Sequence, residues 1–167
     1  MASAGGSPRG SDAVPAGRRC PPGARRARRG PRRVTAYVDS SALLKRYVRE
    51  PDSDEAALLL AADPVLVTSW VTVTEVRRNV ARLVRPEHLA ELRRQITSDL
   101  DRFALVVADQ VVCESAANIA EQLGVGSLDA IHLASARRLQ VVGLSFITFD
   151  LRQAQAARSL GFNVLGV

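Results

Sequence analysis

Strand-like runs and helical segments alternate along the chain from residue 34 to its end. Runs of apolar, often β-branched residues predict strands at 34–38, 65–68, 104–107, 144–149 and 164–165. The spacing of apolar residues between these runs predicts a first helix ending at 48 and others at 52–62, from about 72, and at 86–103, 111–123, 127–139 and 151–160. The strand runs are continuously apolar, which is typical of a sheet covered on both faces. The alternation therefore predicts an α/β fold with three layers and a mostly parallel sheet of about five strands.

Charge divides the chain into two parts. Residues 1–33 contain nine arginines and one acid, a net charge of +8, and otherwise mainly Gly, Pro, Ala and Ser. Residues 34–167 contain fourteen basic and sixteen acidic residues, a net charge of −2, and their length suits one globular domain with its own core. We therefore expect a disordered tail at 1–33 and a folded domain at 34–167.

The tail has two interpretations. Clustered arginine binds phosphate without sequence preference, so the segment could serve as a nucleic-acid arm. It could instead be an extension that is no part of the functional protein, and translation starting near Val34 would leave it out. We favour the second interpretation, because such tracts are often only solvated charge.

Three observations bear on where the protein acts. The arginines precede no secretory apolar run, no segment has the length of a membrane span, and Cys20 and Cys113 lack a disulfide or metal spacing. We therefore expect a cytoplasmic protein with reduced thiols.

Four carboxylates are predicted to lie at or near the start of a helix. They are Asp39, Glu75, Asp129 and Asp150. In a parallel sheet helix starts gather at one edge, where open α/β folds build their sites. Two unit charges about 4 Å apart repel by roughly 4 kcal/mol at an effective dielectric of about 20. Such a cluster either takes up protons or holds a divalent metal, and the second possibility makes the chain a candidate enzyme.

Each of these acids also has a structural explanation at a helix terminus. The structural roles are an N-cap for Asp39, a capping box of Thr72 with Glu75, a favourable dipole contact for Asp129 and a capping box of Asp150 with Gln153. Capping explains the acids one by one, but not why three of them follow strands at the same sheet edge without a lysine beside them. Asp129 differs because it shares a largely apolar helix row with Leu133 and Ala136, where an unpaired carboxylate is costly.

Four segments resemble the PIN domain, and most closely the VapC-type toxins of bacterial toxin–antitoxin pairs. They are residues 38–44 (VDSSALL), 73–76 (VTEV), 127–134 (SLDAIHLA) and 147–150 (ITFD). The resemblance covers residues 35–167 in order, including Leu160, Gly161 and Phe162 before the last strand. Any one segment is a weak signal, whereas four in order at fitting intervals are fairly specific. The tail at 1–33 has no counterpart in this pattern.

This resemblance implies a metal-dependent ribonuclease. The acids that would hold Mg²⁺ or Mn²⁺ are Asp39 and Asp129 as direct ligands, with Glu75 and Asp150 binding directly or through water. Oxygen ligands suit Mg²⁺, which keeps several waters and binds a few carboxylates together with substrate phosphate. A bound cation activates a water and neutralises charge at the scissile phosphate. The implied function is therefore that of an endoribonuclease toxin in a toxin–antitoxin pair.

Other side chains near the acids carry more limited expectations. Thr148 lies two residues before Asp150 and points to the same side of a strand, so Thr148 and Ser40 could contact substrate or a metal-bound water. A strand threonine favoured for its β-propensity explains Thr148 equally well. His132, one turn after Asp129, is expected to be a packed helix residue rather than a general base. Five arginines are candidate phosphate contacts, although a solvated face is the default for each: Arg46, Arg49, Arg77, Arg78 and Arg152.

The resemblance also implies partners. These are an RNA substrate, a cognate VapB-type antitoxin and a second copy of the chain in a homodimer. The helical stretches at 52–62 and 72–103 could present an apolar groove to an antitoxin peptide, in a helix-in-groove mode.

Three other classes of protein share parts of this pattern. A response-regulator receiver carries an acidic pocket on a similar fold, but it needs a lysine late in the chain, and the only lysine is Lys45. A haloacid-dehalogenase-type phosphatase needs Asp-x-Asp after the first strand, where this chain has Asp39-Ser40-Ser41. A catalytically silent PIN-like RNA-binding module stays open, because a fold does not determine function.

Overall fold

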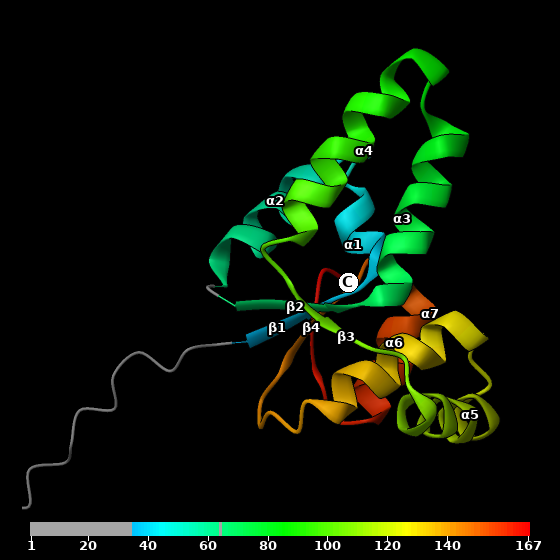
Figure 1. Ribbon diagram of the computed structural model, residues 1–167. Helices are drawn as coiled ribbons and strands as arrows, with labels where there is room; N and C mark the ends of the chain where they lie inside the picture. Colours follow the sequence, from blue (N-terminus) through cyan, green and yellow to red (C-terminus); the bar gives the residue numbers. More distant parts are fainter. Residues whose placement is uncertain (1–34, 64) are drawn as a thin grey trace, which may run out of the picture. The chain divides into compact units, whose positions relative to one another are not determined.

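The computed structural model describes residues 35–63 and 65–167, and in this part of the chain five parallel strands form one sheet (Figure 1). The strands are β1 (Thr35–Val38), β2 (Val65–Ser69), β3 (Ala104–Val106), β4 (Ser145–Ile147) and β5 (Asn163–Leu165). Their order is β3-β2-β1-β4-β5, and every neighbouring pair is parallel. The predicted sheet is confirmed, whereas the expectations for the tail at 1–33 lie outside the described residues.

Seven helices in the described part of the chain connect these strands and cover both faces of the sheet. They are α1 (Ser40–Leu44), α2 (Ser53–Ala62), α3 (Trp70–Leu83), α4 (Pro86–Leu100), α5 (Gln110–Leu123), α6 (Ser127–Arg138) and α7 (Leu151–Ser159). Helices α1 to α4 lie on one side of the sheet and α5 to α7 on the other (Figure 1). The predicted three-layer α/β architecture is confirmed. Across residues 35–63 and 65–167, no helix is long and apolar enough to cross a membrane.

Neighbouring residues of the central strands belong to two different cores. In β1, Val38 packs in the core that contains Leu43 of α1 and Val76 of α3, whereas Tyr37 belongs to the core on the opposite face. There Tyr37 stacks on Phe146 of β4, with the ring centroids 5.3 Å apart. Successive side chains of a strand point to opposite faces, so a strand buried on both sides needs an apolar residue at every position. This requirement explains the uninterrupted apolar runs of the sequence.

Helix α3 begins before its predicted position at residue 72. Its N-cap is Ser69, whose hydroxyl accepts a hydrogen bond from the N–H of Val71 at 3.3 Å. Thr72 is buried, and its hydroxyl bonds that of Thr68 at 2.6 Å. The suggested capping box of Thr72 with Glu75 is therefore wrong. Because Glu75 lies in the second turn and not at the N3 position, its carboxylate is available for tertiary contacts.

A buried carboxylate fixes the turn that follows α1. Helix α1 ends at Leu44, not at residue 48 as predicted. Asp99 of α4, which is 4% exposed, accepts hydrogen bonds from Arg46 Nε at 2.7 Å and from Tyr47 Oη at 3.1 Å, and it also pairs with Arg102. Burial raises the pKa of Asp99, but the hydrogen bonds and charges of its cationic partners outweigh burial and hold the pKa below its usual value. Arg46, a candidate phosphate contact from the sequence, is thus engaged by the protein itself.

Replacing Asp99 with asparagine should lower the free energy of unfolding at pH 7 by about 1–3 kcal/mol, because two guanidinium groups lose a charged acceptor. The folded pKa of Asp99 lies below the unfolded value, so its stabilisation is complete above about pH 4 and is lost as the pH falls through the folded pKa. Urea unfolding of the wild type and of Asp99→Asn at pH 7 and at pH 3 measures this difference. The gap between the two proteins should shrink at pH 3, and a gap of constant size would contradict this account.

Candidate active site

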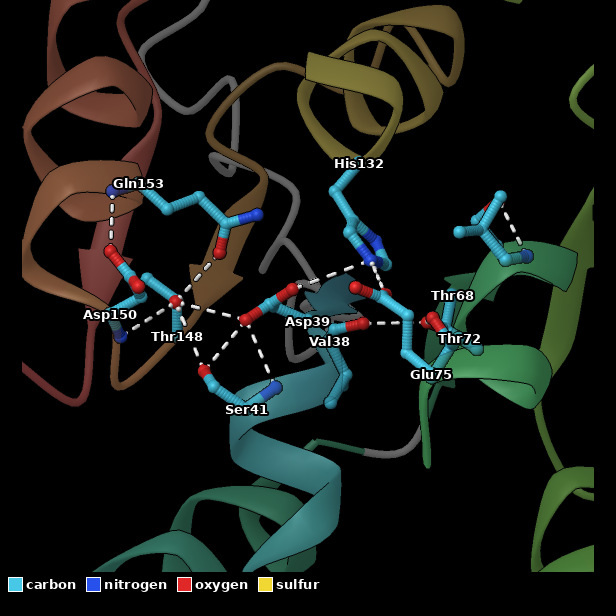
Figure 2. Close-up of polar contacts among 12 residues, drawn as sticks. Val38, Asp39, Ser41, Thr68, Thr72, Glu75, His132, Thr148, Asp150 and Gln153 are labelled. Carbon is cyan, nitrogen blue, oxygen red and sulfur yellow. Dashed lines mark hydrogen bonds and ion pairs between the residues drawn. The ribbon is translucent and has the colours of Figure 1, made fainter. Parts of the chain in front are cut away.

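The carboxyl ends of three strands bring together three of the predicted acids. Asp39 follows β1, Glu75 lies in the second turn of α3 after β2, and Asp150 is the N-cap of α7 after β4 (Figure 2). Because β1 lies between β2 and β4 in the sheet, Asp39 occupies the central position. The fourth acid, Asp129, comes from the first turn of α6.

Asp39 is held by one carboxylate oxygen and leaves the other less engaged. Its Oδ2 accepts hydrogen bonds from the N–H of Ser41 at 3.1 Å, from Ser41 Oγ at 2.6 Å and from Thr148 Oγ1 at 3.1 Å. Oδ1 lies 3.5 Å from His132 Nε2. The N-cap role suggested by the sequence is therefore confirmed, and it uses only Oδ2. The serine that contacts Asp39 is Ser41, whereas the sequence had singled out Ser40, whose hydroxyl makes no hydrogen bond among the described residues.

Thr148 connects Asp39, which follows β1, with Asp150, which follows β4. It is fully buried; its Oγ1 contacts Asp39, accepts the N–H of Asp150 at 3.1 Å and lies 2.8 Å from Gln153 Oε1. Two acceptors therefore share one hydroxyl hydrogen. The side chain of Thr148 points, as expected, to the edge of the sheet that carries Asp39, Glu75 and Asp150, which we call the acidic edge. A contact of Thr148 with substrate stays a prediction. Gln153 Nε2 is buried and has no hydrogen-bond partner among the described residues.

The main chain of Thr148 is enclosed by the end of the neighbouring strand. Its N–H donates to the carbonyl of Leu165 at 3.1 Å. Gly166 has a φ of +106°, and a Cβ there would lie 2.4 Å from the carbonyl oxygen of Thr148. Only glycine combines this backbone conformation with so close an approach.

His132 joins the acidic edge to the core beneath it. The ring is fully buried, and its Nε2 lies 2.6 Å from Glu75 Oε2 (Figure 2). Its Nδ1 lies 2.9 Å from Tyr37 Oη. The expectation of a packed residue is confirmed, but the sequence analysis missed the contacts with Glu75 and Asp39. A signal was present, because His132 follows Asp129 by three residues and therefore lies on the same side of α6.

The charges of the other acids act on both Asp129 and His132. Burial raises the pKa of Asp129, and the charges of Asp39 and Asp150 raise it further. Burial lowers the pKa of His132, but the charge of Asp39 and the hydrogen bond with Glu75 outweigh burial, so the net pKa is raised. Both shifts have the sign expected where negative charge is concentrated.

Asp150 is the most exposed of these acids. Its Oδ1 caps α7 by accepting the N–H groups of Arg152 at 2.8 Å and of Gln153 at 3.0 Å. The N-cap suggested by the sequence is confirmed, but the side chain of Gln153 turns to Thr148 and does not complete a capping box.

The donor set fits a hard divalent cation that brings its own waters. Among residues 35–63 and 65–167 no group of three or more His, Cys, Asp or Glu side chains forms a ready-made metal site. Mg²⁺ does not require such a group, because it keeps several waters and binds one or two carboxylates together with phosphate. Asp39 Oδ1 and the half-buried Asp129 offer oxygen ligands in a region where burial and then the like charges of Asp39 and Asp150 raise the pKa of Asp129. A bound cation would relieve that repulsion.

A hollow of about 480 Å³ extends from Asp129 between α7 and the loop before α6. Its lining includes Gly126, Arg152 and Gln155, so one wall carries a cation close to the acids. Arg152, expected as a phosphate contact, makes no ion pair among the described residues.

Comparisons with known proteins point to one family. The family model of the PIN domain matches residues 36–159. Ribonuclease VapC46 from Mycobacterium tuberculosis (strain ATCC 25618 / H37Rv) is 36% identical over 129 residues, which cover 77% of this chain and 95% of that protein. The structure of FitAcB from Neisseria gonorrhoeae matches with a TM-score of 0.63 at 22% identity, over 78% of this chain and 96% of that one. VapBC-5 from Mycobacterium tuberculosis, a member of the VapBC family of toxin–antitoxin systems, matches with a TM-score of 0.57 at 16% identity, over 80% and 99%.

The chain belongs to the PIN domain family, since the family model covers well over half of its length. Its similarity to VapC46 places it among the VapC-type members of that family. The resemblance drawn from the four sequence segments is thereby confirmed, and the two solved structures show the same fold.

Ser41 and Ser40 provide a matched test of the Asp39 geometry. Replacing Ser41 with alanine removes a donor to the buried carboxylate of Asp39 and an acceptor for the N–H of Phe149 at 2.9 Å. The free energy of unfolding should fall by about 1–3 kcal/mol, as for a hydrogen bond to a charged group. Thermal and urea unfolding measure the change. Ser40→Ala should fall within about 0.5 kcal/mol of wild type, and equal losses in the two variants would contradict the assignment.

Proposed function

We propose that this protein is a divalent-metal-dependent endoribonuclease and acts as the toxin of a toxin–antitoxin pair. Its VapC-type relative carries the name ribonuclease. The observation that carries the proposal is the convergence of Asp39, Glu75 and Asp150 on one sheet edge, with a raised pKa at Asp129 caused in part by the charges of its neighbours. A divalent cation would balance the negative charge of acids held together in this way.

Each acid has a distinct role in the proposal. Mg²⁺ or Mn²⁺ would be held by Asp39 and Asp129, with Glu75 and Asp150 contributing directly or through water. A cation bound there lowers the pKa of a bound water and neutralises charge that develops on the scissile phosphate.

The protein supplies orientation around these acids. Ser41 and Thr148 fix Asp39 through one oxygen, and the cap of α7 fixes Asp150. Thr148 and Ser40 retain their proposed contacts with substrate or with a metal-bound water. Orienting ligands before substrate arrives reduces the reorganisation that the reaction requires.

RNA would approach from the hollow beside Asp129. Arg152 lines this hollow and is the arginine best placed for a phosphate contact. Arg46 and Arg49 are committed to Asp99 and Asp54, so they contribute less. Because residues 34–167 carry a net negative charge, local cations near the acids are needed to admit a polyanion.

The antitoxin would dock on the α1–α4 side of the sheet. A hollow of about 210 Å³ there has an apolar and a charged half, lined by Leu43, Leu60, Leu66 and Phe103 and by Arg46, Asp63, Asp99 and Arg102. Such a mixed lining suits an amphipathic peptide, which offers both apolar and charged side chains. VapBC-5 is described as a toxin–antitoxin system; we propose for this chain a VapB-type antitoxin, a homodimeric assembly and action in the cytoplasm.

Replacing Asp39 with asparagine should abolish most metal-dependent cleavage of RNA. The loss should exceed the roughly 10–100-fold decrease that follows removal of a hydrogen-bond partner of a metal ligand. Initial rates of cleavage of single-stranded RNA with Mg²⁺, compared with an EDTA control, measure it. Asp54→Asn is a matched control, because Asp54 is an exposed acid whose carboxylate pairs with Arg49 and not with the residues of this site. Intact RNA with the wild type across a broad panel of substrates would favour the catalytically silent RNA-binding module.

A further inference from the structure

The buried imidazole of His132 lies between two carboxylates, those of Glu75 and Asp39, and the hydroxyl of Tyr37 in the core. His132 Nε2 is 2.6 Å from Glu75 Oε2 and 3.5 Å from Asp39 Oδ1, while Nδ1 is 2.9 Å from Tyr37 Oη. His132 and Tyr37 are both fully buried. Glu75 comes from α3 on one face of the sheet, whereas His132 comes from α6 on the other. The ring therefore ties the two layers together at the acidic edge (Figure 2).

The neighbours of each ring nitrogen of His132 determine which atom donates in its hydrogen bonds with Glu75 and Tyr37. Nε2 faces two carboxylates, so it must carry a hydrogen, because a lone pair there would be repelled by both. In the neutral ring Nδ1 is then the acceptor and Tyr37 Oη–H is the donor. In the protonated ring, which the raised pKa of His132 favours, Nδ1–H donates to Tyr37 Oη instead. In either state Nε2–H points to Glu75, and Tyr37 holds the ring at its other nitrogen.

These hydrogen bonds restrict which oxygen of Glu75 can bind a cation or a water. Its Oε2 contacts His132, so Oε1 is the freer oxygen for a cation or a water. Asp39 is similar, because Oδ2 accepts from Ser41 and Thr148 and Oδ1 is the freer oxygen. The direction in which Glu75 presents Oε1 therefore depends on the imidazole.

We propose that His132, oriented by Tyr37, is a positioning residue that holds Glu75 in the arrangement required by the divalent cation. This inference rests on the metal-dependent function proposed above. Buried hydrogen-bond partners of ligands fix ligand geometry, and their loss weakens metal binding by about 10–100-fold. A residue needed only for packing would not have this effect, so the two roles can be separated.

Three substitutions separate positioning from packing. His132→Leu keeps an apolar side chain in the core but removes the donor to Glu75. His132→Gln retains an N–H donor of similar reach and serves as the conservative rescue. Tyr37→Phe removes only the hydroxyl that bonds His132 Nδ1 and keeps the aromatic ring that stacks on Phe146.

The experiment is calorimetric titration of the full 167-residue chain with Mn²⁺ alone, without RNA. We expect His132→Leu to bind Mn²⁺ roughly 10–100-fold more weakly than wild type, as for other lost partners of metal ligands. His132→Gln should recover most of this loss, and Tyr37→Phe should show a smaller loss in the same direction. Thermal unfolding in EDTA reports whether each variant is folded.

The outcomes distinguish this inference from the function on which it rests. Mn²⁺ affinity of folded His132→Leu that equals or exceeds that of wild type would overturn the positioning role, because the imidazole would then be a packing residue or a competitor of the cation. Equal losses in the Leu and Gln variants would overturn it as well. If His132→Leu does not fold, Tyr37→Phe decides, and an unchanged affinity there overturns the proposal. A wild type that binds no Mn²⁺ instead refutes the metal-dependent function itself.

Discussion

Repulsion between carboxylates at one sheet edge is the constraint on which the site depends. The parallel sheet places the ends of β1, β2 and β4 side by side, so Asp39, Glu75 and Asp150 must lie near one another. Hydrogen-bond donors directed at three of these carboxylates offset part of this repulsion. Ser41 and Thr148 stabilise Asp39, the first turn of α7 stabilises Asp150, and His132 stabilises Glu75. Within the described part of the chain no donor of this kind contacts Asp129, and burial together with the charges of Asp39 and Asp150 raises its pKa.

The two-sided sheet makes this arrangement rigid. Each central strand contributes side chains to both cores, and residues next to the site take part in them. Tyr37 belongs to one core and Val38 to the other, and Asp39 follows immediately. The acid therefore begins at a point whose backbone is fixed from above and below. A site that must oppose like charges benefits from such a base, because packed interiors yield little to local strain.

The sequence was sufficient for the architecture and for the acids, but not for their partners. Continuous apolar runs predicted five parallel strands because burial on both faces leaves a direct trace in composition. The start of α3 was predicted too late in the chain. Its N-cap is Ser69, the last residue of β2, whereas Thr72 has the spacing of an N-cap from Glu75 but bonds Thr68 instead. Ser41 was overlooked in favour of Ser40, since which of two adjacent hydroxyls reaches Asp39 depends on the helix geometry.

The role of His132 was harder to predict for a related reason. Its contacts with Glu75 and Tyr37 join residues 57 and 95 positions apart in the chain, and no local pattern records such pairs. Burial of an imidazole was predictable from its apolar neighbours, whereas its hydrogen bonds were not. Local propensity and periodicity carry no information on contacts of that range.

Gly166 shows that a position without functional groups can be decisive for this site. A methyl group there would meet the carbonyl oxygen of Thr148 at 2.4 Å, so the main chain that carries this threonine would have to shift. The hydroxyl that Asp39 and Gln153 share would shift with it. A search for inactivating substitutions that considers only polar side chains would omit Gly166. The end of β5 nevertheless supports the site, because its backbone contacts the main chain of Thr148.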